Sequence, residues 1–175
     1  MEGDTMYEIL FVCTGNTCRS PMAERIMANL LKQSGLDTQV SVSSAGLFAL
    51  TGDAMSPGAQ AALLRRGIGQ GETHKARRLT EEQITQADLV LTMTEAHKKT
   101  LLQAFPKFQE KIFTLLEYAK ESAGEGGVSA DQLPTSLDVQ DPFGLDDEEY
   151  ERAARQIEDA CVSIIQRFQN NRQLP

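Results

Sequence analysis

Two cysteines and an arginine lie close together near the start of the chain, in the stretch CTGNTCRSP at residues 13–21. Five residues separate Cys13 from Arg19, and Gly15 gives the segment between them a permissive backbone. A tight loop of this length can point successive backbone N–H groups inward and bind an anion such as phosphate. The same N–H groups favour the thiolate form of a cysteine, and a guanidinium binds two phosphate oxygens at once. The stretch therefore predicts phosphoryl transfer to the sulfur of Cys13.

Two other interpretations of these cysteines remain open at this point. A cysteine at the end of an apolar run is often a small buried hydrophobic residue without a chemical role. Cys13 and Cys18 could also be metal ligands, but His74 and His97 stand at no ligand spacing from them. No metal and no organic cofactor is therefore expected.

The elements on both sides of the loop would hold it in position. The apolar run YEILFV at 7–12 predicts a buried strand before it. A helix is predicted after it, with Ser20 as N-cap, Pro21 at the first helical position and Gly35 after its end. Ligands of parallel α/β sheets bind at the carboxyl ends of strands, next to helix N-termini. The loop is expected at such a place.

The rest of the chain alternates between strand and helix patterns. Further strands are predicted at 38–46, 88–93 and 111–116, further helices at 56–67, 79–87, 95–105 and 145–169, and a long surface loop at 121–137. This alternation predicts an α/β fold with three layers, α/β/α, around a central, mostly parallel four-stranded sheet. We expect residues 1–175 to form one domain, with residues 1–6 as a flexible N-terminal extension.

Composition excludes several classes of partner. The net charge of −8 argues against nucleic acid, which is bound mainly through lysine and arginine. No apolar run approaches the ~20 residues that cross a bilayer, and the acidic start MEGDTMYE is unlike a signal peptide. Three cysteines fit a reducing compartment better than a disulfide framework. We therefore expect a cytoplasmic protein, most simply a monomer.

The loop and four further motifs resemble one known family. The stretch ILFVCTGNTCRSPMAE is similar to the signature of the low-molecular-weight protein phosphatases. Other matching motifs follow in the family's order: SSAG at 43–46, HKARRLT at 74–80, DLVLTMT at 88–94 and DPFG at 141–144. The resemblance covers nearly the whole chain, and it implies the family's fold and a hydrolase that acts on phosphorylated protein substrates.

The resemblance also implies a role for each residue of the loop. Cys13 would be the nucleophile, Arg19 the phosphate clamp, Ser20 a hydrogen-bond donor to the Cys13 thiolate, and Asn16 a brace for the loop. The other residues of the phosphate-binding loop would be Thr14, Gly15, Thr17 and Cys18. Cys18 would also be a redox partner that captures oxidised Cys13 as a disulfide.

A carboxylate of the DPFG motif completes the site that the resemblance implies. Asp141 would be the general acid that protonates the leaving group and later activates water. From the residues alone, a plain turn is the preferred interpretation of DPFG, and Asp138 is a competing carboxylate. The third cysteine, Cys161, is expected in the core of the last helix.

Thr17 and Phe143 are the residues that suggest a substrate. Tyrosine phosphatases of the family carry an apolar residue where this chain has Thr17, and an aromatic pair in place of Phe143-Gly144. This chain instead resembles the branch that acts on phosphoarginine in proteins. A guanidino group brings several N–H donors that need acceptors, and a threonine hydroxyl is one. The alternative is that Thr17 touches no substrate, in which case phosphotyrosine would be hydrolysed.

Two further alternatives come from other functional classes. Arsenate reductases resemble this chain in loop and fold, but they use a further cysteine pair in the C-terminal half, where this chain has only Cys161. A module that binds phosphoproteins without hydrolysis would have no need of the nucleophile Cys13. Both are weaker interpretations than a phosphatase.

Overall fold

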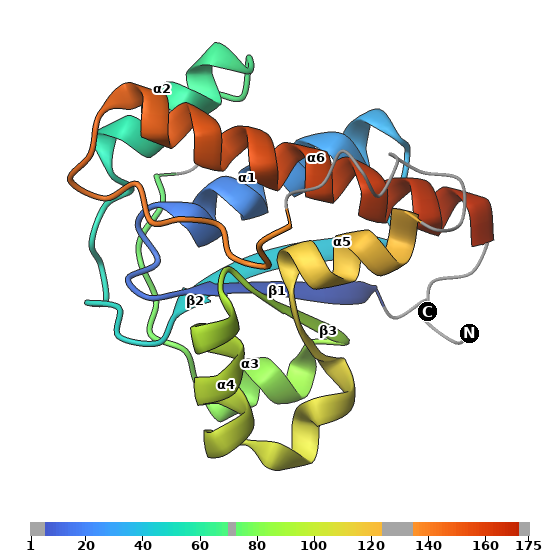
Figure 1. Ribbon diagram of the computed structural model, residues 1–175. Helices are drawn as coiled ribbons and strands as arrows, with labels where there is room; N and C mark the ends of the chain where they lie inside the picture. Colours follow the sequence, from blue (N-terminus) through green and yellow to red (C-terminus); the bar gives the residue numbers. More distant parts are fainter. Residues whose placement is uncertain (1–5, 70–72, 124–134, 172–175) are drawn as a thin grey trace.

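Four parallel strands form the centre of the molecule (Figure 1). The computed structural model describes residues 6–69, 73–123 and 135–171. The strands are β1 (Tyr7–Cys13), β2 (Val40–Gly46), β3 (Leu89–Thr92) and β4 (Ile112–Thr114), in the order β2-β1-β3-β4. All three pairings are parallel, and the register pairs Cys13 with Gly46 at the carboxyl end of the sheet.

Helices cover both faces of this sheet, because side chains of β1 alternate between two apolar clusters. Ile9 and Phe11 pack with the helices of one face, and Leu10 and Val12 with those of the other. The first face carries α1 (Arg19–Gln33), α2 (Pro57–Arg65), α5 (Leu115–Ala123) and α6 (Asp147–Asn171); the second carries α3 (Glu81–Gln86) and α4 (Glu95–Ala104), and the 3₁₀ helix η1 (Pro106–Lys111) precedes β4 (Figure 1). The predicted three-layer α/β/α fold is confirmed.

The start of α1 differs from the prediction. Its N-cap is Cys18 and not Ser20, and Arg19 is the first helical residue. Ser20 is already inside the helix, where its hydroxyl lies 2.9 Å from Cys13 Sγ. The prediction was wrong because a serine before a proline is the usual sign of an N-cap, whereas here that hydroxyl serves another side chain.

The region after η1 also differs. The strand expected at 111–116 ends at Thr114, and α5 begins at Leu115 and continues through residues 121–123 of the expected loop. Thr114 Oγ1 accepts a hydrogen bond from the Glu117 N–H (3.0 Å), and Glu117 Oε2 accepts one from the Thr114 N–H (3.1 Å). These reciprocal bonds form a capping box. It starts α5 at the apolar residues Leu115 and Leu116, which by themselves would also suit a strand.

Some of the predicted segments cannot be compared. Residues 1–5 of the expected N-terminal extension and residues 124–134 of the expected loop lie outside the described residues. Within the described part of the chain, no helix is long and apolar enough to cross a membrane.

Candidate active site

Cys13 is the last residue of β1, and its side chain is buried. The backbone N–H of Asn16 points at its sulfur from 3.3 Å, and Ser20 Oγ lies 2.9 Å away. Ser20 Oγ accepts a hydrogen bond from the side-chain amide of Asn16 (2.8 Å), and its own hydrogen has two acceptors in reach, Cys13 Sγ and, at 3.5 Å, the Ala45 carbonyl. Two donors are therefore in reach of Cys13 Sγ, an arrangement that stabilises a thiolate.

Asn16 holds the loop in shape. It is fully buried and has a φ of 55°, in the left-handed region that asparagine tolerates better than most residues. Its side chain donates to Ser44 Oγ (2.9 Å) and accepts from the Arg77 N–H (2.9 Å), and its carbonyl accepts from His74 Nε2 (2.7 Å). Ser44 donates in turn to the Glu24 carboxylate. Contacts from the SSAG and HKARRLT segments thus fix the turn.

The end of β2 lies directly against the loop at Gly46. A Cβ atom on this residue would stand 2.6 Å from the Thr14 carbonyl oxygen and 2.8 Å from the Asn16 nitrogen. Real Cβ atoms do not approach so closely, so only glycine fits here. The neighbouring Leu47 N–H donates to the Cys13 carbonyl (2.9 Å), which ties the two strand ends together.

Arg19 projects from the first turn of α1 and is only 4% exposed. One terminal nitrogen of its guanidinium donates to the Val139 carbonyl (3.0 Å), and the other pairs with Asp141 Oδ2 (3.1 Å). Its Nε is buried and has no hydrogen-bond partner among the described residues. An unpartnered buried N–H beside Cys13 is a donor suited to an oxyanion.

The structure separates the two carboxylates that compete as general acid. Asp138 accepts a hydrogen bond from the Glu95 N–H (2.7 Å) at the start of α4. Asp141 is half exposed and lines the same pocket as Cys13. Asp141 Oδ1 also accepts from the Phe143 N–H (3.2 Å), so DPFG is at once a turn and a carboxylate at the pocket.

An open pocket of about 1290 Å³ lies over the loop. Its lining includes the predicted residues Cys13, Thr14, Gly15, Thr17, Cys18, Arg19, Asp141 and Phe143. Phe48, Leu50 and Phe143 are exposed at its mouth and form an apolar rim. The side chains of Asn16 and Ser20 are fully buried and do not line the pocket. The predicted residues therefore lie close together: most line the pocket, and Asn16 and Ser20 are buried beneath its surface.

Cys18 is buried below the pocket and is a free thiol. Its Sγ donates to Ser56 Oγ (3.1 Å), the hydroxyl that caps α2, and lies 3.6 Å from the Tyr150 hydroxyl of α6. The Tyr150 ring packs on Gly58, where a Cβ would stand 2.4 Å from it. Burial raises the pKa of Tyr150, so this hydroxyl stays neutral.

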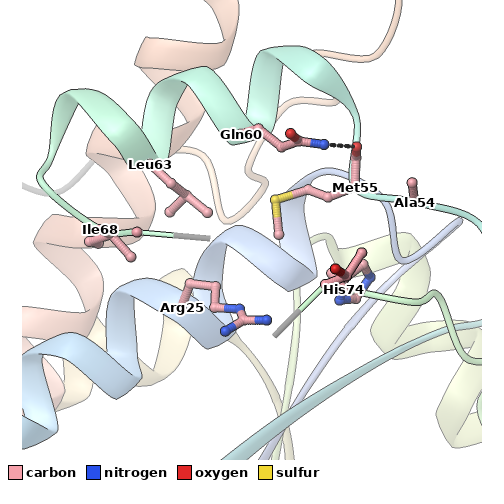
Figure 2. A pocket seen from close by; sticks show the side chains of 9 residues that line it. Arg25, Ala54, Met55, Gln60, Leu63, Ile68 and His74 are labelled. Carbon is pink, nitrogen blue, oxygen red and sulfur yellow. Dashed lines mark hydrogen bonds between the residues drawn. The ribbon is translucent and has the colours of Figure 1, made fainter. Parts of the chain in front are cut away.

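A second, smaller cavity lies behind the wall that contains Met55 (Figure 2). Gln60 Nε2 donates to the Met55 carbonyl (2.7 Å), as the dashed line in Figure 2 shows, and His74 lies on the opposite side. Met55 lines both this cavity and the pocket over Cys13.

Sequence reasoning missed His97, a further side chain that contacts the loop. His97 is in the first turn of α4, and its Nε2 lies 2.8 Å from Thr14 Oγ1. Burial, and then the positive charge of Arg19, lower the pKa of His97 to about 4. The imidazole is therefore neutral near pH 7. No motif or ligand spacing marked this histidine, because its partner is 83 residues away in the sequence.

A buried thiol at a strand end, an anion-binding loop and an arginine at a helix start together define a cysteine-dependent phosphatase site. The model of the family "Low molecular weight phosphotyrosine protein phosphatase" matches residues 8–174, and this chain belongs to that family.

Individual relatives differ in the substrate that their names give. The chain is 37% identical to the protein-arginine-phosphatase of Bacillus subtilis over 94% of this chain and 99% of the relative. It is 32% identical to the low molecular weight protein-tyrosine-phosphatase PtpB of Staphylococcus epidermidis, over 90% and 96%. A solved structure of the YwlE arginine phosphatase with a phosphorylated active-site serine superposes with a TM-score of 0.77 at 34% identity, over 94% and 97%.

Proposed function

We propose that this protein hydrolyses phosphoarginine in phosphorylated proteins through a cysteinyl-phosphate intermediate. The observation that carries the substrate is Thr17, which lines the same pocket as Cys13 and Asp141. The named activity of the Bacillus subtilis relative supports the same substrate. Hydrolysis of phosphotyrosine is the second candidate, supported by the family and by the PtpB relative.

The first step transfers the phosphoryl group to sulfur. Cys13 Sγ attacks phosphorus as the P–N bond breaks, and the electron pair of that bond stays on the leaving guanidine nitrogen. Asp141 gives its proton to this nitrogen, since a guanidine is a poor leaving group unless it is protonated. The Nε of Arg19 and the N–H groups of the loop stabilise charge on the phosphoryl oxygens.

The second step releases phosphate. The Asp141 carboxylate takes a proton from water while the water oxygen attacks phosphorus, and the P–S bond breaks. The electron pair returns to Cys13, whose thiolate is stabilised by the Asn16 N–H and the Ser20 hydroxyl. Both donors are in place before the reaction, so little reorganisation is needed.

The Thr17 environment supports the choice between the two substrates. Its backbone is fixed, because its carbonyl accepts from the Ser56 N–H (2.9 Å). Within the described part of the chain its hydroxyl has only a long contact, with Cys18 Sγ (3.7 Å), so it can accept a hydrogen bond from a substrate. A site built to hydrogen-bond its substrate rejects an analogue that lacks the group, often by about 10⁴-fold.

A paired measurement tests the proposal. Phosphate release is measured from a phosphoarginine peptide and a phosphotyrosine peptide of the same sequence, with wild type and Thr17→Ile. We expect wild type to prefer phosphoarginine and Thr17→Ile to gain activity on phosphotyrosine. A wild type that prefers phosphotyrosine would leave the Cys13 mechanism standing and refute the arginine assignment.

Three other expectations stay predictions. They are a monomeric state, a cytoplasmic location, and a disulfide between Cys13 and Cys18 after oxidation. The last is consistent with Cys18 being a free thiol in the same loop.

A further inference from the structure

Thr14 is a second threonine in the lining of the pocket. It directly follows Cys13, is exposed, and lines the same pocket as Thr17 and Asp141. Its carbonyl accepts from the Phe48 N–H (2.9 Å), so its backbone is fixed.

The side chain of Thr14 is fixed as well, by His97. Thr14 Oγ1 lies 2.8 Å from His97 Nε2, and His97 itself is only 8% exposed. The His97 N–H is bonded to Thr94 Oγ1 (3.1 Å), the N-cap of α4, so the imidazole sits on a rigid helix start. Thr14 is thus an exposed residue of the pocket lining whose hydroxyl is held by a nearly buried side chain, so it is oriented before any substrate binds.

We propose that Thr14 is a second specificity residue, which accepts a hydrogen bond from the guanidino group of phosphoarginine, and that His97 is its positioning residue. This inference rests on the proposed function. A guanidino group offers several N–H donors, and each one left unpaired in the pocket weakens binding. Thr14 and Thr17 supply acceptors from the loop, and Asp141, which lines the same pocket, supplies another.

The direction of the bond to His97 decides what Thr14 can do. When Thr14 donates its hydrogen to Nε2, both lone pairs of Oγ1 remain for the substrate. Donation to the ring also polarises the oxygen and makes it a stronger acceptor. This arrangement requires a neutral imidazole with its proton on Nδ1.

The groups around His97 favour the neutral ring. Burial and the charge of Arg19 act against protonation, while Asp138 and Asp141 act more weakly in its favour. Nδ1 has no hydrogen-bond partner among the described residues. The bond between Nε2 and Thr14 fits either tautomer, so measuring the tautomer gives the direction of this bond.

Kinetics of Thr14 variants give the first test. The quantity is the ratio of kcat/KM for a phosphoarginine peptide to kcat/KM for p-nitrophenyl phosphate, whose leaving group has no N–H. Thr14→Val should lower this ratio roughly tenfold to a hundredfold, because an acceptor for the guanidino group is lost. Thr14→Ser should keep it within about threefold. Thr100→Val, which removes an exposed hydroxyl bonded to the Ala96 carbonyl, is the matched control and should leave the ratio unchanged.

Variants of His97 separate positioning from packing. His97→Gln retains an oxygen that accepts from Thr14 and should retain most of the ratio, whereas His97→Leu should lower it as Thr14→Val does. Equal ratios for both variants and wild type would refute the role of His97.

The tautomer is the second measurement, and it needs no substitution at Thr14. The chain has two histidines, so ¹⁵N spectra of the imidazoles at pH 7 are simple, and His97→Gln identifies the remaining signal as His74. The proposal expects a neutral His97 with its proton on Nδ1. A proton on Nε2 would make Thr14 the acceptor of that bond and would overturn the proposal.

The two proposals fail in different ways. A wild type that releases no phosphate from the phosphoarginine peptide refutes the proposed function. A wild type that does, together with an unchanged ratio in Thr14→Val, refutes only the role of Thr14.

Discussion

The stability of the fold should depend on pH through His97. The pKa of this histidine is lowered from 6.5 to about 4 by burial and by the charge of Arg19, against weaker opposing effects of Asp138 and Asp141. Between these two values the unfolded chain binds a proton that the folded chain does not. Stability therefore falls as the pH drops from about 6.5 to about 4, and this contribution changes little outside that window.

The size of the effect follows from the two pKa values. At pH 5 the unfolded histidine is almost fully protonated and the folded one is mostly neutral, which costs about 2 kcal/mol relative to pH 8. Below pH 4 the cost approaches its limit of about 3 kcal/mol. His97 is only 8% exposed, so screening by solvent reduces these values little.

Urea unfolding of wild type and His97→Gln at pH 8 and pH 5 measures this cost. Other groups also titrate in this range, but they are common to both proteins and cancel in the difference. We expect the free energy of unfolding of wild type to fall about 2 kcal/mol more than that of the variant. A difference below about 0.5 kcal/mol would mean that His97 titrates normally in the fold, and it would refute the account of its burial.

Four further substitutions test the site and its frame. Gly46→Ala should lower kcat for p-nitrophenyl phosphate at least about tenfold, since its Cβ would stand 2.6 Å from the Thr14 carbonyl; unchanged kinetics would contradict this packing. Asp141→Asn should lower kcat for phosphoarginine about 10²–10⁴-fold, and single-turnover kinetics that show no change in the chemical step would exclude Asp141 as the acid. After peroxide, wild type should regain activity with reductant while Cys18→Ser does not, and mass spectrometry should find a Cys13–Cys18 link. Thr114→Ala should lower the free energy of unfolding by about 1 kcal/mol in urea, because it removes the cap of α5.

Elements were predicted correctly from the sequence where the local pattern of residues favours the same structure as the tertiary packing. The apolar run that became β1 and the helices begun by Ser56, Thr80 and Thr94 carry strong local signals, and each is found near its predicted position. The capping box at Thr114 and Glu117 is also a local signal, with the required spacing of three residues. It was missed because the β-branched and aromatic residues before it favour a strand.

The contacts behind the loop could not be predicted in the same way. Asn16 is joined to Ser44, His74 and Arg77, which lie 28 to 61 residues away in the sequence. Each motif that contains these residues is visible, but no spacing says which atom of one meets which atom of another. His97 is a stronger case, because nothing in its neighbourhood distinguishes it from an ordinary helical residue.

Ser20 shows why a helix-capping rule based on local sequence gives a wrong prediction at the active site. A serine before a proline is the best local candidate for an N-cap, and a cap hydroxyl must accept from the N–H groups of its own helix. The Ser20 hydroxyl is instead inside the helix, where it accepts from the Asn16 side chain and lies 2.9 Å from Cys13 Sγ. The N-cap residue of α1 is Cys18, which makes no side-chain cap hydrogen bond. The N–H groups at that start are thereby left for an anion in the loop, so the missing cap and the donor to Cys13 serve the same chemistry.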